Sequence, residues 1–80
     1  MPYKFSLNHD IYQKPSLEKT ISDYSQYCKV KTQPADENNT TIEIFVNPEH
    51  LQNAEQIKNE FLNYVLDLSI KTVFSTSRNN

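Results

Sequence analysis

The chain contains no glycine in 80 residues, and this restricts both its turns and the sites it can build. Glycine is the residue that most readily adopts a positive φ and lets a backbone approach a phosphate closely. Glycine-rich phosphate-binding loops, both the P-loop and the dinucleotide fingerprint, are therefore excluded. Turns and helix ends must use Asn, Asp, Ser and Pro instead. Asparagines stand where the pattern requires such residues, at Asn8, Asn38, Asn39 and Asn47.

The length allows one small domain with a thin core. A chain of this size buries about 60–65% of its unfolded surface on folding. Five Tyr and four Phe supply the large apolar areas that such a core needs. We expect residues 1–71 to form one domain and residues 72–80, which end in Ser-Thr-Ser-Arg-Asn-Asn, to be a disordered tail.

Charge and composition exclude several classes of partner. Eight basic and ten acidic residues give a formal net charge of -2, which lacks the basic footprint of a nucleic-acid-binding protein. Apolar runs are far shorter than the roughly 20 residues that span a bilayer, and the N-terminus has no apolar signal segment. The single cysteine, Cys28, excludes an intramolecular disulfide. We expect a cytoplasmic protein that binds neither nucleic acid nor membrane.

Alternation of apolar and polar side chains predicts three strands. Residues 2–8 alternate, and residues 40–46 do so most clearly, with many β-branched side chains. A shorter strand is expected at residues 30–32, and the polar residues 33–39 are expected to form a mobile hairpin loop. The predicted inward side chains of the two clearer strands are Tyr3, Phe5, Leu7, Ile42, Ile44 and Val46.

Apolar stripes at helical spacing predict two helices. The first spans residues 16–28, with Ser16 as its N-terminal cap. The second spans residues 48–71 and begins at Asn47-Pro48-Glu49, a cap residue followed by proline and an acid. The first stripe consists of Leu17, Ile21, Tyr24 and Cys28. The second consists of Leu51, Ala54, Ile57, Phe61, Val65 and Leu68, with a further row at Leu62, Leu66 and Ile70.

The order of elements, β-α-β-β-α, predicts an α+β fold. Its simplest closure is a small two-layer domain in which a three-stranded antiparallel sheet carries both helices on one face. An edge of such a sheet could accept an extended peptide, although Lys29 and Lys31 would blunt one edge.

The residues that could suggest catalysis or metal binding are few. They are His9, Asp10, Cys28 and His50, and their spacing matches none of the close-paired ligand patterns of zinc sites. Cys28 falls on an apolar stripe, where a thiol usually acts as a small hydrophobic side chain. We predict no catalytic residue, no metal site and no cofactor. An enzyme would require His9 or His50 to lie in a cleft with a carboxylate, which the pattern does not indicate.

Residues 60–71 resemble the signature region of the HxsD family of the His-Xaa-Ser system. That signature reads approximately as a Leu and Asn pair followed by a Leu-rich helix ending in Leu-Arg. Ile11-Tyr12 before the first helix and the strand at 41–46 agree with the family in order and spacing, so the likeness covers most of residues 3–71. Ile70-Lys71 stands where the family favours Leu-Arg. The chain therefore resembles a divergent member.

The resemblance implies a non-catalytic accessory protein, encoded beside radical-SAM enzymes that modify a ribosomally made peptide. Its partner would be the radical-SAM maturase or the precursor peptide. At the family's polar helix positions stand Glu60, Asn63 and Asp67, which become candidate contacts, although the ordinary interpretation of such a stripe is a solvated face. The predicted apolar and aromatic anchors are Phe61, Tyr64 and Leu68.

Two alternatives remain open for the C-terminal part of the second helix, where the further row at Leu62, Leu66 and Ile70 widens the apolar face. It could belong to the core of a monomer, or it could form an interface. A self-associating structural or regulatory protein of phage or mobile-element type would pair this helix with its own copy as a homodimer.

Overall fold

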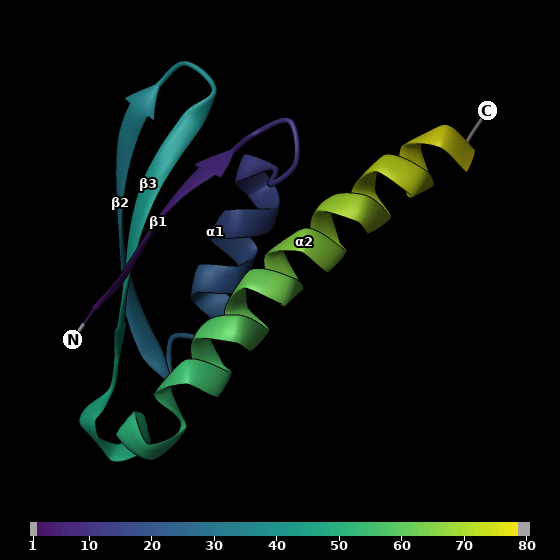
Figure 1. The fold of residues 1–80 in the computed structure, drawn as a ribbon. Coiled ribbons are helices and arrows are strands. Elements are labelled where there is room, and N and C mark those ends of the chain that lie inside the picture. Colours follow the sequence, from purple (N-terminus) through teal and green to yellow (C-terminus); the bar gives the residue numbers. More distant parts are fainter. Residues whose placement is uncertain (1, 79–80) are drawn as a thin grey trace.

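The computed structural model describes the backbone of residues 2–78 and the side chains of residues 2–70. The sheet has the strand order β1-β3-β2 and is antiparallel throughout. Both helices lie on the same side of this sheet (Figure 1). The predicted α+β fold is confirmed. The elements are β1 Tyr3–Asn8, α1 Lys14–Asp23, β2 Cys28–Asp36, β3 Asn39–Val46, a 3-10 helix η1 Pro48–Asn53, and α2 Ala54–Arg78.

The core lies between the inner face of the sheet and the two helices. Ile42 and Ile44 of the central strand are fully buried, as are Phe61 and Val65 of α2. Burying such a side chain stabilises the fold by about 1.5–3 kcal/mol. The alternation predicted for β1 and β3 is confirmed by the register, which pairs Phe5 with Ile42. The buried apolar cluster is Leu7, Leu17, Cys28, Ile42, Ile44, Ile57, Phe61 and Val65.

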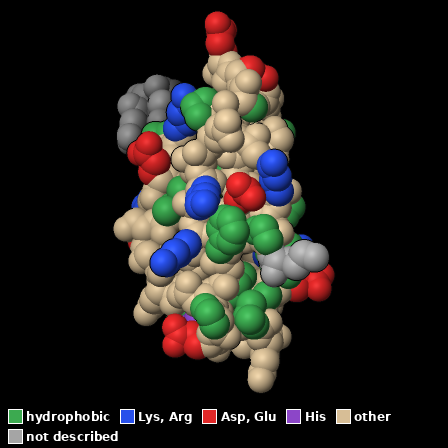
Figure 2. All heavy atoms as spheres, turned by 90° about the vertical axis from the view of Figure 1, so that its left-hand side faces the viewer, with side chains coloured by type: hydrophobic (Ala, Val, Ile, Leu, Met, Phe, Trp, Pro, Cys, Tyr) green, Lys and Arg blue, Asp and Glu red, His purple; other side chains and the backbone are tan. Residues whose placement is uncertain are grey.

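The outer face of the sheet carries a mixture of lysine, acidic and apolar side chains. Lys4 and Lys31 flank Glu43 in register across the three strands. The Lys31 ammonium lies 5.4 Å from the centre of the Phe45 ring. Figure 2 shows lysine side chains beside apolar groups on this side of the molecule. An antiparallel sheet covered on one face only has this half-solvated second face.

The first helix differs from its prediction at both ends. It begins at Lys14, two residues early, because Pro15 suits the first turn. Ser16 is buried inside the helix, so its prediction as the cap is wrong. The helix ends at Asp23, five residues before the predicted end. Cys28 matched the helical stripe because it reaches the same core from the first position of β2, where it pairs with Val46.

The hairpin is longer and tighter than predicted. Residues 33–39 are not a mobile loop, because β2 continues to Asp36 and β3 begins at Asn39. Residues 31–37 are all exposed, so this extension has no apolar alternation from which it could be predicted. In place of glycine, the Asp36 carboxylate accepts hydrogen bonds from the Asn38 amide at 2.9 Å and from Asn39. No residue described has a positive φ.

The second helix begins with a separate 3-10 turn. Residues 48–53 form η1, and the α-helix proper starts at Ala54. The tighter winding of a 3-10 helix shifts the helical register. Leu51, predicted on the buried stripe, is consequently 55% exposed. The predicted cap Asn47 makes no capping bond to its helix, since its side chain donates to the Gln26 carbonyl at 3.0 Å.

The second helix also ends later than predicted. Its backbone is helical to Arg78 rather than to residue 71. Residues 72–78, predicted as a tail, continue the helical backbone, and residues 79–80 lie outside the described part. No glycine or proline occurs between Ala54 and Arg78, so no residue of the kind that usually ends a helix interrupts it.

Candidate functional site

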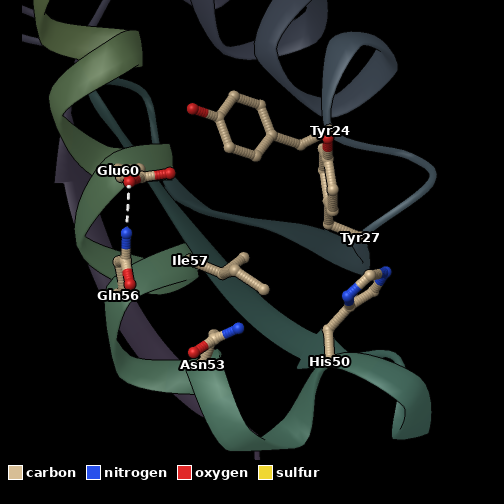
Figure 3. A pocket seen from close by; sticks show the side chains of 7 residues that line it. All are labelled: Tyr24, Tyr27, His50, Asn53, Gln56, Ile57 and Glu60. Atoms are coloured by element: carbon tan, nitrogen blue, oxygen red, sulfur yellow. Dashed lines mark hydrogen bonds between the residues drawn. The ribbon is translucent and has the colours of Figure 1, made fainter.

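A cleft opens where the end of α1, the 3-10 turn η1 and the start of α2 meet. Its volume is about 310 Å³. In Figure 3 the side chains of Gln56 and Glu60 stand on one side, with Tyr27 and His50 on the other. Ile57 lies between these two walls. The lining residues are Tyr24, Tyr27, His50, Asn53, Gln56, Ile57 and Glu60.

Backbone hydrogen bonds hold the aromatic wall of the cleft. The amide of Tyr27 donates to the Tyr24 carbonyl at 2.9 Å, which closes a turn after α1. The Asn47 amide donates to the Tyr27 carbonyl at 2.9 Å, and the His50 amide donates to the Asn47 carbonyl, also at 2.9 Å. These bonds join the turn to η1. The wall is thus a preformed part of the fold.

Three rings stand close together in this wall. Tyr24 and Tyr27 have ring centres 6.0 Å apart in an edge-to-face arrangement, and Tyr27 and His50 have centres 5.2 Å apart in the same arrangement. Tyr24 also meets Phe61 of the core at 5.7 Å. Such pairs are favourable beyond the area they bury. Tyr24 therefore links the exposed Tyr27 ring to the core, and the His50 ring is linked through Tyr27.

The opposite wall is polar. The side-chain amide of Gln56 donates to Glu60 Oε2 at 3.0 Å, one helical turn away. The pKa of Tyr24 is raised, first because the hydroxyl is partly desolvated and second because of the negative charge of Glu60. The field of this carboxylate therefore reaches across the cleft to the aromatic wall.

A second polar group adjoins the cleft beside Tyr24. The Tyr64 hydroxyl donates to Asp23 Oδ2 at 2.8 Å, and the Tyr64 ring lies 5.6 Å from that of Tyr24. This hydrogen bond is the main cause that lowers the pKa of Asp23 and raises that of Tyr64. Lys19 forms an ion pair with Asp23 at 3.3 Å. Asp23 thus fixes the Tyr64 side chain against α1.

The predicted partner-binding residues fall into three groups. Glu60, Asn63 and Asp67 are exposed, and Glu60 also lines the cleft. Tyr64 and Leu68 are partly buried. Phe61 is fully buried in the core, so its side chain is not accessible to a partner in this structure. Its position in the apolar stripe already indicated burial.

The remaining residues singled out in the sequence have separate places. His9 Nδ1 donates to the Tyr12 carbonyl at 2.8 Å, while Nε2 lies 2.7 Å from the Thr40 hydroxyl. Asp10 accepts a hydrogen bond from Asn38. Burial raises the pKa of the Cys28 thiol. Within the described residues, no group of three or more His, Cys, Asp and Glu side chains could hold a metal ion.

Several cleft residues were missed by the sequence interpretation. Tyr27, Asn53 and Gln56 were not singled out, and His50 was considered only for catalysis or a metal. His50 does lie in a cleft with the carboxylate of Glu60, on the opposite wall (Figure 3). Two tyrosines three residues apart in a polar segment were a usable signal. Their meeting with η1 depends on tertiary structure.

Comparison of the chain with protein-family models, with curated proteins and with solved structures finds no match. Among the residues that the structure describes, no helix is long and apolar enough to cross a membrane. The cleft and the helix face beside it are therefore the surfaces that bear on function.

Proposed function

We propose that this chain is a non-catalytic binding module that holds a polypeptide partner in the cleft and along the adjoining face of α2. The observation that carries the proposal is the continuity of the two surfaces. Glu60 lines the cleft and also begins the exposed polar stripe that continues through Asn63 and Asp67. A partner that inserts one side chain into the cleft can therefore extend along the helix.

The composition of the cleft supports recognition of a side chain. Its volume of about 310 Å³ lies at the small end of the range for ligand pockets, about 300–1,000 Å³. Tyrosine and histidine rings present large contact areas with little loss of rotamer freedom, and aromatic residues are frequent hot spots of protein interfaces. The aromatic wall would supply affinity, and the polar stripe would form the rim.

The resemblance to the HxsD family supplies the class of partner. It favours a radical-SAM maturase or its precursor peptide, encoded beside this gene and present in the same cytoplasm. The Gln56–Glu60 pair and the Tyr24–Tyr27–His50 wall offer both polar and aromatic contacts to such a polypeptide.

The proposal is tested by calorimetric titration of the purified chain with the maturase and with the precursor peptide whose genes adjoin its own. We expect one of the two to bind, and Glu60→Lys to weaken that binding at least about tenfold, because a charge is reversed at the centre of the surface. Glu55→Lys is the matched control, since Glu55 is exposed on the same helix but does not line the cleft. Adjoining genes that encode no such system, or equal effects of the two variants, would contradict the proposal.

A second candidate, self-association through α2, is favoured by the exposure of its apolar row. Ile70 is 43% exposed, and Leu62 and Leu66 are partly exposed. In Figure 1 the C-terminal part of α2 extends beyond the sheet and α1. Such a helix could pair with its own copy across a two-fold axis.

Light scattering over a concentration series separates the two candidates. A heterologous partner predicts a monomer of 9.4 kDa at all concentrations. Self-association predicts a dimer that Leu66→Glu converts into a folded monomer, because the substitution buries a charge in the interface. The control is Asp67→Asn, which changes the neighbouring exposed position without adding a charge.

A further inference from the structure

The aromatic wall of the cleft has the geometry of a partial cage. The Tyr24, Tyr27 and His50 rings stand at 60° and 61° to their neighbours, so they present surfaces of different orientation to the cavity. The negative face of a tyrosine ring attracts a cation held within about 6 Å of its centre. Angled aromatic rings around a small cavity therefore favour a cationic or planar apolar group.

The charge of the cleft favours a cationic group over a planar apolar one. Glu60 is the acid among the lining residues, and neither a lysine nor an arginine of the described residues lines the cleft. Its hydrogen bond from Gln56 uses Oε2, and a carboxylate has room for several further donors. Figure 3 shows the Glu60 carboxylate directed toward the side of the cleft that carries Tyr24. A cation in the cavity would meet the carboxylate on one side and rings on the other.

The polar lining residues of the cleft are also complementary to a cation that carries N–H donors. The carboxamides of Asn53 and Gln56 line the floor and the acidic wall, and each carries a carbonyl oxygen that can accept from N–H donors. A guanidinium has five such donors in one plane, binds a carboxylate through two of them, and stacks on aromatic rings. An ammonium on a flexible stem matches this lining less fully.

We infer that the cleft binds the arginine side chain of a peptide or protein partner, with the guanidinium between Glu60 and the rings of Tyr24, Tyr27 and His50. This inference rests on the proposed function and names the group that the cleft recognises. The rest of the partner would lie along the stripe that Asn63 and Asp67 continue. The cavity volume of about 310 Å³ accommodates one long side chain with adjoining backbone.

The experiment is a titration of ¹⁵N-labelled chain, at fixed neutral pH, with acetyl-Gly-Arg-Gly amide, followed by amide chemical shifts. The matched probe is the citrulline peptide, which keeps the shape of the side chain and removes its charge. We expect saturable shifts at Tyr24, Tyr27, His50 and Glu60. We expect the citrulline peptide to bind at least about tenfold more weakly, since a hydrogen bond to a charged group is stronger than a neutral one.

Two substitutions locate the effect. Glu60→Gln should abolish the preference for arginine over citrulline, whereas Glu55→Gln should leave it unchanged, because Glu55 lies outside the cleft. Tyr27→Leu should weaken the binding of the arginine peptide, and its amide spectrum should remain that of a folded chain. This second variant keeps the test decisive if Glu60→Gln disturbs the helix.

Three outcomes would overturn the inference. They are equal binding of both peptides, shifts that centre on another acidic group such as Asp36 or Glu43, and no saturable shift at the cleft. The proposed function is tested independently of the arginine inference. A maturase or precursor peptide that binds through the cleft without an arginine would leave that function standing and refute the arginine inference alone.

Discussion

Polar side chains at two places along α2 have opposite environments. Near the C-terminal end, Ser69 is 2% exposed. Its hydroxyl donates to the Val65 carbonyl and accepts from the Gln13 amide, both at 2.9 Å. Near the N-terminal end, Gln56 and Glu60 are exposed and line an open cleft. One helix therefore has a closed end and an open end.

The difference between the two ends indicates that one contributes to stability and the other to binding. At the closed end the described hydrogen bonds satisfy polar groups inside the protein, and no buried side-chain nitrogen or oxygen among the described residues lacks a partner. At the open end the rings of Tyr27 and His50 face the cavity with the carboxylate of Glu60 opposite (Figure 3). Changes at the closed end should alter stability, and changes at the open end should alter binding.

The largest effect is expected between the two ends, where Phe61 joins the core to the aromatic wall. Phe61→Ala should lower the free energy of unfolding by about 3–5 kcal/mol, because it leaves a cavity in a fully packed position. A small domain has only about 5–15 kcal/mol in total. Urea denaturation measures the loss. Phe45→Ala, at a partly exposed position on the outer sheet face, should lower the free energy of unfolding by only about 1–2 kcal/mol, and equal losses in the two variants would contradict the assigned core.

The closed end is tested by Ser69→Ala. We expect a loss of about 1–3 kcal/mol in the free energy of unfolding, because the amide of Gln13 loses its acceptor in a partly buried site. Binding of the arginine peptide should not change. Ser22→Ala, at an exposed position of α1, should stay within about 0.5 kcal/mol of wild type. A change in peptide affinity caused by Ser69→Ala would break the distinction between the ends.

The open end is tested by Tyr27→Leu, which should change binding more than stability. Tyr27 is 38% exposed, so stability should fall by less than about 1 kcal/mol. Affinity for the arginine peptide should fall about fivefold, since one ring of the cage is lost. Denaturation and peptide titration of the same sample measure both quantities. A large loss of stability with unchanged affinity would make Tyr27 a structural residue.

The smallest effect concerns the Asp23–Tyr64 pair, which lies between the ends. The hydrogen bond from Tyr64 is the main cause that lowers the pKa of Asp23 below its ordinary value of 3.8. A lowered folded-state pKa gives stabilisation that is present above the unfolded pKa and disappears as the pH falls through the folded pKa. Tyr64→Phe should move the pKa of Asp23 back toward 3.8.

Carboxyl ¹³C shifts recorded during an acid titration measure this pKa directly. Lys19→Met is the companion variant, because the hydrogen bond and the charge of Lys19 each lower the pKa of Asp23 less than the hydrogen bond from Tyr64 does. An unchanged pKa of Asp23 in Tyr64→Phe would contradict this hydrogen bond as the main cause.

The sequence predicted the parts of the fold that bury one face. The alternation in β1 and β3 and the stripe from Ile57 through Phe61 to Val65 correspond to buried positions or to partly buried positions that pack against the core. The second half of β2 was not predicted, because its residues are exposed and pair through backbone hydrogen bonds. The pattern of side chains carries no information on such bonds. Leu51 was misplaced because a 3-10 turn changed the register.

The candidate site was predicted only in part, for a related reason. Glu60 and Tyr64 lie on a regular helix, so spacing placed them correctly on its outer side. Tyr27 and His50 meet because the Tyr24–Tyr27 turn and η1 are joined through the Asn47 amide. No periodic pattern encodes that meeting. Of the helical wall, the sequence therefore predicted Glu60 as a site residue and missed Gln56, and it also missed the wall made by irregular backbone.

The most direct test of the two-ended description is amide hydrogen exchange of the wild-type chain with and without the partner, maturase or precursor peptide, that binds it. We predict added protection at residues 24–28 and 50–60, around the cleft, and none at residues 13–20, which pack at the closed end. Protection confined to the β2 edge at residues 28–36, or centred on Ile70, would contradict the account and place the binding surface elsewhere.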